Sequence, residues 1–129
     1  MANAVAIKVL LVDDQNSVRQ MARMTLEEIG FRHILEAENG VKAMETASLQ
    51  PLDLIISDYN MPEMDCLALL RAVRGHPAVR KVPFILLTGR GDRELVVKAA
   101  QAGVNNYLVK PFTAEILRQK IEQVMGKLT

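Results

Sequence analysis

The strongest constraint on the fold is a fivefold alternation between short apolar runs and segments with helical spacing. Such runs, without alternating polar residues, are typical of strands that are buried on both faces of a parallel sheet. The predicted strands are residues 7–12, 34–37, 52–57, 83–88 and 106–109. Because parallel neighbours need crossover connections, we expect an α/β sandwich of three layers, with helices on both faces of the sheet.

Apolar side chains that recur three and four residues apart predict the helices between these strands. Three clear stripes are Val18, Ala22, Leu26 and Ile29; Leu95, Ala99 and Ala102; and Leu117, Ile121, Val124 and Leu128. Gly30 and Gly103 follow two of the stripes, where a left-handed residue commonly ends a helix. Thr113 stands where a side chain can cap the start of the last helix. These end signals support the alternation of strand and helix.

Length and charge exclude several classes of protein. The chain is predicted to form one domain, residues 1–129, without an effector domain. No apolar run approaches the ~18 residues of a membrane span, and the single Cys66 cannot form an internal disulfide, which fits a reducing cytoplasm. Lys and Arg number 16 against 15 Asp and Glu, so the net charge of +1 lacks the basic footprint of nucleic-acid binding. We expect a cytoplasmic monomer that binds neither nucleic acid nor membranes.

Polar side chains gather at the carboxyl ends of the predicted strands, which is where sheets of this type bind ligands. Asp13 and Asp14 follow the first strand, and Asp58 follows the third. Thr88 ends the fourth strand, and Lys110 follows the fifth. Carboxylates brought together repel one another, which raises a pKa or requires a cation, and hard oxygen ligands suit Mg²⁺. The sequence therefore predicts a magnesium site at this edge.

Each of these residues also has a plain structural interpretation. Asp14 could cap the first helix, Thr88 could be an ordinary strand residue, and Tyr107 could belong to the core. Lys110 could be a solvated residue at a strand end, although the following Pro111 fixes a turn that a cis bond could set. These alternatives stay open from the residues alone.

Four motifs surround these positions: VLLVDD, LIISDYNMPEMD, LLTG and AAQAGVNNYLVKPFTAEIL. They resemble the receiver domain of two-component response regulators, and the resemblance covers essentially the whole chain. It implies the flavodoxin-like (βα)5 fold, doubly wound, with the sheet order 2-1-3-4-5. The likeness is strongest to the single-domain chemotaxis regulators of this family. It implies a phosphorylation-activated switch that controls the flagellar motor, or alternatively a stand-alone receiver that acts in a phosphorelay or regulates a non-motor partner by docking.

The resemblance implies the chemistry of the site. Asp58 matches the phosphoacceptor, which receives a phosphoryl group from a histidine kinase. Asp13 and Asp14 match the acidic pair that holds Mg²⁺ together with Asp58 and the backbone carbonyl of Asn60. Lys110 matches the lysine that contacts the phosphoryl group. The implied protein is a signalling protein that assists its own phosphorylation and dephosphorylation.

The same resemblance implies a switch and marks three departures from the family pattern. Thr88 and Tyr107 match switch residues that remodel the face made by the fourth helix, fifth strand and fifth helix, where a target such as a flagellar motor switch protein would bind. Cys66 stands where relatives usually have glycine. Gly89 replaces a more usual alanine in the loop 89–91, which we expect to be flexible. Arg90 brings a positive charge that could alter docking of a phosphatase.

Two rival classes fit the sequence less well. A phosphatase of the haloacid type would also place an aspartate after a strand, but it would need a second aspartate two residues later, where this chain has Asn60. A receiver that has lost phosphorylation would be expected to lack the acidic pair, the acceptor or the lysine, and all of them are present. We therefore expect a phosphorylatable receiver.

Overall fold

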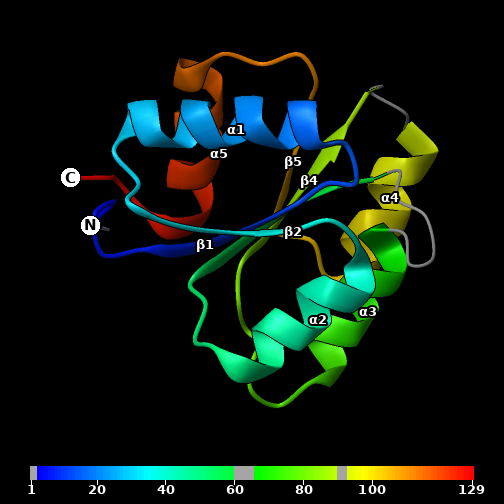
Figure 1. Cartoon of the computed structure of the whole chain (residues 1–129). Helices are drawn as coiled ribbons and strands as arrows, with labels where there is room; N and C mark the ends of the chain where they lie inside the picture. Colours follow the sequence, from blue (N-terminus) through cyan, green and yellow to red (C-terminus); the bar gives the residue numbers. More distant parts are fainter. Residues whose placement is uncertain (1–2, 60–65, 90–92) are drawn as a thin grey trace.

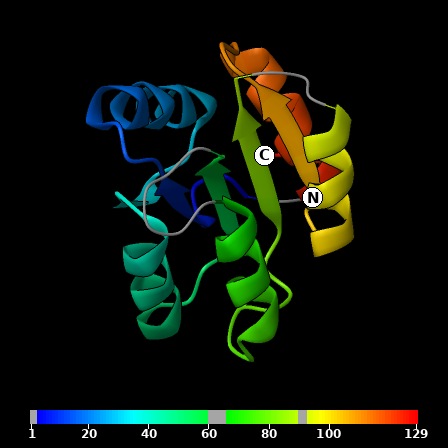
Figure 2. The ribbon, with the colours of Figure 1, turned by 90° about the vertical axis from the view of Figure 1, so that its right-hand side faces the viewer.

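A parallel sheet of five strands, covered by helices on both faces, forms the centre of the molecule (Figure 1). The computed structural model describes residues 3–59, 66–89 and 93–129. The strands are β1 (Lys8–Val12), β2 (His33–Ala37), β3 (Leu54–Asp58), β4 (Phe84–Thr88) and β5 (Asn106–Val109). Their order in the sheet is β2-β1-β3-β4-β5, which confirms the order that the resemblance implied. Figure 2 shows the arrows of β3, β4 and β5 pointing the same way.

The helices divide between the two faces, as Figure 1 shows. The helices are α1 (Asn16–Ile29), α2 (Gly40–Leu49), α3 (Cys66–Gly75), α4 (Arg93–Ala102) and α5 (Ala114–Met125). One apolar cluster joins the sheet to α1 and α5, and a second joins it to α2, α3 and α4. Val9 and Leu11 face the first cluster, whereas Leu10 and Val12 face the second. Both faces of β1 are thus buried, which explains its unbroken apolar sequence.

The helix ends follow the sequence signals with one exception. Gly30 has φ 125° and ends α1, Gly103 has φ 100° just after α4, and the Thr113 side chain accepts a hydrogen bond from the Ile116 amide. The expectation that Leu128 continues the last helical stripe is wrong. The helix α5 ends at Met125, since the following glycine has a positive φ, and Leu128 is buried beyond the helix.

The third strand begins and ends later than predicted. Residues 52–57 were expected from the apolar run, but Asp53 instead forms the entry to the strand. Its amide donates to the Lys8 carbonyl oxygen, and its carboxylate accepts from the Lys8 amide. At the other end of the strand, Asp58 pairs with Leu87 of β4 and is the last residue of β3, not the first residue after it. Its position is therefore set by the ladder of the sheet.

A single side chain ties α3 to the far end of α4. The Arg74 Nε and Nη2 atoms donate to the Gly103 carbonyl oxygen at 3.1 and 2.8 Å, and Nη1 donates to the Val82 carbonyl oxygen at 2.7 Å. Nη2 also reaches the Asn105 side-chain oxygen at 2.8 Å. Arg74 thereby connects the segments that lead into β4 and β5.

No helix in the part of the chain that the structure describes is long and apolar enough to cross a membrane.

Candidate functional site

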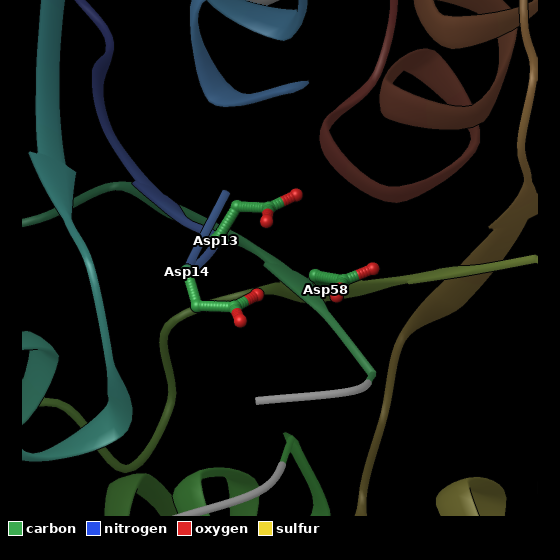
Figure 3. A group of neighbouring side chains, drawn as sticks. All are labelled: Asp13, Asp14 and Asp58. Atoms are coloured by element: carbon green, nitrogen blue, oxygen red, sulfur yellow. The ribbon is translucent and has the colours of Figure 1, made fainter. Parts of the chain in front are cut away.

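Three carboxylates meet at the carboxyl edge of two adjacent strands. Val12 of β1 pairs with Ser57 of β3, so the residues that follow them in the chain come out side by side. Asp13 and Asp14 follow β1, and Asp58 ends β3. One carboxylate oxygen from each of the three lies within 4.8 Å of the other two. Figure 3 shows the three side chains at this edge, which confirms that the predicted acidic residues cluster.

The cluster concentrates negative charge in a partly buried place. Asp13 and Asp58 are 2% and 5% exposed, whereas Asp14 is exposed to solvent. Burial raises the pKa of Asp13, and the charges of Asp58 and Asp14 raise it further, while a hydrogen bond from the Gln15 amide and the charge of Lys110 act in the opposite direction. The net shift is upward. Such a cluster of hard oxygen atoms fits a divalent cation such as Mg²⁺.

Asp13 is held from its backbone and from its side chain. Its amide donates to the Ala37 carbonyl oxygen at 3.1 Å, and its Oδ1 accepts from the Gln15 amide at 2.9 Å. Its own carbonyl oxygen accepts a 2.7 Å hydrogen bond from Nη1 of Arg19. Gln15 is the N-cap residue of α1, without a side-chain cap, so the interpretation of Asp14 as the cap is wrong.

Lys110 reaches across the edge from β5 to the acidic cluster. Its Nζ donates to Oδ1 of Asp58 in an ion pair, and its side chain is 27% exposed. Its backbone amide donates to the Thr88 carbonyl oxygen at 2.7 Å, and the peptide bond to Pro111 is cis. Lys110 is therefore a partner of Asp58, and its interpretation as a solvated strand-end residue is wrong.

Thr88 and Tyr107 lie on the same side of the sheet. Leu86 of β4 pairs with Tyr107 of β5, and Thr88 is two residues further along β4, which places all three on one face. Thr88 is buried, and the half-buried Tyr107 packs against the apolar cluster that includes Leu86 and α4. The Lys120 Nζ lies 5.1 Å from the centre of the Tyr107 ring. The Tyr107 ring is therefore partly buried and partly exposed.

The remaining expectations have mixed outcomes. Asn60 and Arg90 lie outside the described residues, as does most of the loop 89–91. Cys66 begins α3 and is buried, with its amide donating to the Tyr59 carbonyl oxygen at 3.3 Å. Gly89 is exposed, and a Cβ atom built on it would meet nothing within 4 Å.

The sequence analysis did not single out Arg19, which contacts the acidic loop, or Glu36, which binds Arg19. Arg19 of α1 binds the Asp13 carbonyl oxygen, and Glu36 of β2 accepts from the same arginine at 2.7 Å. An arginine one turn into the helix that follows an acidic loop is a signal that could have drawn attention to Arg19. Nothing local marks its partner, because the two are 17 residues apart.

The fold and the acidic edge together define a class of signalling protein, the receiver, which is activated by phosphorylation. Residues 9–122 match the family model of the response regulator receiver domain, and the chain belongs to this family. It is 48% identical to the probable chemotaxis protein CheY of Rhizobium etli over 128 residues, which cover 99% of both chains.

Solved structures agree with this family. The chemotaxis response regulator CheY4 of Vibrio cholerae has a TM-score of 0.85 and 35% identity, covering 92% of this chain and 98% of that one. The receiver domain of the sensor histidine kinase PA1611 of Pseudomonas aeruginosa has a TM-score of 0.79 and 32% identity, covering 95% of this chain and 100% of that one. That structure holds a magnesium ion in its active site cleft. The chain is thus a receiver related to chemotaxis regulators.

Proposed function

We propose that this protein is a switch in which Asp58 accepts a phosphoryl group from a histidine kinase, with Mg²⁺ as cofactor. The observation that carries the proposal is the position of Asp58. It is buried at the end of a central strand, with the carboxylates of Asp13 and Asp14 on one side and the ammonium group of Lys110 on the other. This arrangement combines a nucleophile with groups that can hold and offset phosphoryl charge.

The reaction needs little covalent help from the protein. A carboxylate oxygen of Asp58 forms a bond to phosphorus, while the bond between phosphorus and the donor breaks and the donor leaves with the electron pair. The product is an acyl phosphate, which water can hydrolyse. Lys110 forms an ion pair with Asp58, so its positive charge lies beside the acceptor and would offset the negative charge of the incoming phosphoryl oxygens. The same groups therefore assist both phosphorylation and dephosphorylation.

The three aspartates, with the backbone carbonyl of Asn60 that the family pattern adds, would hold the magnesium ion. When bound, the ion would supply positive charge that offsets the repulsion between the carboxylates and the phosphoryl oxygens. Burial raises the pKa of Asp13, and the charges of Asp58 and Asp14 raise it further. This upward shift supports the assignment, because a bound cation would stabilise the buried carboxylate in its ionised form. The magnesium ion in the related receiver of PA1611 also supports it.

Thr88 and Tyr107 would convert the new charge into a change of shape. A phosphoryl group adds strong acceptor oxygens, and the Thr88 hydroxyl would move to donate a hydrogen bond to it. Tyr107 lies on the same face of the sheet and is only half-buried, and it would repack when Thr88 moves. The surface formed by α4, β5 and α5 would then bind the target.

The chemotaxis relatives favour a flagellar motor switch protein as the target, with a phosphatase as a further partner. The protein would act as a cytoplasmic monomer of one domain. The alternative output is a phosphorelay or a non-motor partner that is regulated by docking.

Intact-mass spectrometry tests the proposed acceptor. With Mg²⁺ and a small acyl phosphate donor, the wild type should gain one phosphoryl group, whereas EDTA or the substitution Asp58→Asn should prevent it. The matched control is Asp53→Asn, which changes an exposed aspartate at the opposite end of β3 and should leave the yield unchanged. If Asp58→Asn gains the group at full yield, the acceptor is elsewhere and the proposal is wrong.

A further inference from the structure

The Arg19 side chain connects the acidic loop to the neighbouring strand. Its guanidinium donates through Nε to Oε1 of Glu36 at 2.7 Å, through Nη1 to the Asp13 carbonyl oxygen at 2.7 Å, and through Nη2 to Oδ1 of Asn16 at 2.9 Å. The side chain is only 13% exposed. None of these three hydrogen bonds goes to a carboxylate of the acidic cluster, so Arg19 acts on the loop and not on a ligand atom.

The bond to the Asp13 carbonyl oxygen fixes more than one atom. A peptide unit is planar, so this oxygen belongs to the same rigid group as the Asp14 amide nitrogen and both adjoining Cα atoms. The preceding peptide unit is held as well, because the Asp13 amide donates to the Ala37 carbonyl oxygen at 3.1 Å. Both peptide units that flank Asp13 are therefore tethered, one by the backbone of the β2 end and the other by Arg19.

Glu36 determines the direction in which Arg19 points. Its Oε1 also accepts from the Gln20 side chain at 2.9 Å, and its Oε2 accepts from Arg23 at 2.7 Å. Because the guanidinium is planar and has a fixed fork of donors, holding Nε against Glu36 directs Nη1 to the loop. The tether thus runs from a strand of the sheet, through one ion pair, to the peptide between Asp13 and Asp14.

We propose that Arg19 is a positioning residue of the magnesium site, which holds the Asp13–Asp14 peptide so that both carboxylates converge on Asp58 before the ion binds. Three carboxylates within 4.8 Å repel one another, so an untethered loop would relax by moving them apart. Arg19 opposes this relaxation without contacting the ion or the phosphoryl group. This inference rests on the proposed function of the cluster as a magnesium site.

The chain supplies a matched control in the neighbouring Arg23. It pairs with the same glutamate at 2.7 Å, and its other hydrogen bond goes to the Ile34 carbonyl oxygen of β2 at 3.1 Å. Arg23→Met therefore removes the same charge and a bond of the same kind, but it leaves the loop tether intact. Arg19→Lys keeps the charge of Arg19 but cannot reproduce its fork of donors.

The experiment measures the dissociation constant of Mg²⁺ by titration calorimetry in the wild type, Arg19→Met, Arg19→Lys and Arg23→Met. Supporting groups behind metal ligands commonly change affinity by 10- to 100-fold, so we expect Arg19→Met to weaken binding by about 10-fold, Arg19→Lys by less, and Arg23→Met by less than about twofold. Saturating Mg²⁺ should restore the phosphorylation rate of Arg19→Met, because this variant keeps every group that touches the phosphoryl group.

Equal dissociation constants for Arg19→Met and the wild type, or equal losses for Arg19→Met and Arg23→Met, would overturn the positioning role. A wild type that does not bind Mg²⁺ would instead overturn the proposed metal site. In that case, hydrogen exchange in the metal-free protein tests separately whether Arg19 holds the loop. The Gln15 amide, which donates to the Asp13 carboxylate, should exchange faster in Arg19→Met than in Arg23→Met, and equal rates would refute the tether. If Arg19→Met does not fold, Arg19→Lys and Arg23→Lys provide the same comparison.

Discussion

Replacing Asp13 by asparagine should make the metal-free protein more stable. Asp13 is 2% exposed, and its pKa is raised by burial and by the charges of Asp58 and Asp14. A raised pKa means that folding disfavours the ionised carboxylate at neutral pH. Asparagine removes this charge and keeps an Oδ1 atom that can accept the hydrogen bond from the Gln15 amide. The substitution therefore removes the unfavourable free energy of a buried charge and keeps the hydrogen bond from the Gln15 amide.

The separations in the site set the size of the effect. Two like charges 4.8 Å apart, the outer limit for the three oxygen atoms, repel by about 3.5 kcal/mol at an effective dielectric constant of about 20. The ion pair of Lys110 with Asp58 offsets part of this repulsion, and the exposure of Asp14 screens another part. We expect a net gain of about 1–2 kcal/mol in the free energy of unfolding.

Urea denaturation in EDTA at pH 7 measures this gain. The difference between variant and wild type should shrink as the pH falls through the raised pKa of Asp13, because the protonated wild type no longer carries the charge. Added Mg²⁺ should reverse the order of stability. A ligand at 100 times its dissociation constant stabilises the folded state by about 2.7 kcal/mol, and the variant should gain much less than the wild type.

Asp14→Asn is the matched control, because it removes a carboxylate of the same cluster at an exposed position. It should gain less stability than Asp13→Asn in EDTA, while also losing much of the stabilisation by Mg²⁺. The electrostatic reasoning is refuted if Asp13→Asn is less stable than the wild type in EDTA, or if both proteins respond equally to Mg²⁺.

Three further outcomes are expected. Thr88→Ala should still accept a phosphoryl group but, in amide NMR spectra with beryllofluoride, should show smaller shifts around Tyr107 and α5 than the wild type; unchanged shifts would contradict the switch. Glu36→Gln should lower the free energy of unfolding by about 1–3 kcal/mol at pH 7 in urea denaturation. Burial opposes ionisation of Glu36, but two arginines outweigh this effect and lower its pKa. The difference in stability between Glu36→Gln and the wild type should therefore disappear as the pH falls through that pKa. Gly103→Ala should lower stability by about 1–2 kcal/mol, because φ is 100° there and a Cβ atom would meet a side chain at 3.1 Å, whereas Gly89→Ala should change little in thermal unfolding.

The sequence was most informative where one physical cause acted alone. The buried strands follow from unbroken apolar runs, and the meeting of Asp13 and Asp58 follows from their places at the carboxyl ends of strands. The sheet order came from the family resemblance, because apolar patterns do not say which strands pair. The predicted start of β3 was wrong. Asp53 pairs with Lys8, 45 residues away in the chain, and the start of the apolar run therefore lies outside the strand.

The contacts behind the site were beyond local patterns. Arg19 and Glu36 read as ordinary charged residues of a helix and a strand, and only the packing of α1 beside β2 brings them together. The ion pair of Lys110 with Asp58 likewise joins residues 52 positions apart. Their places at strand ends predicted that they share one edge, and the resemblance implied that Lys110 contacts the phosphoryl group, but neither predicted a direct ion pair. Side-chain networks of this kind depend on the three-dimensional fold.

Arg74 fixes one end of the surface that we propose for target binding. Its hydrogen bonds hold Gly103, directly after α4, and the Asn105 side chain, directly before β5. A rigid helix that is held at one end moves least at that end and most at the opposite end. Repacking around Thr88 and Tyr107 should therefore swing the N-terminal end of α4 further than its C-terminal end. A partner that contacts the first turn of α4 would therefore meet the largest displacement of the helix.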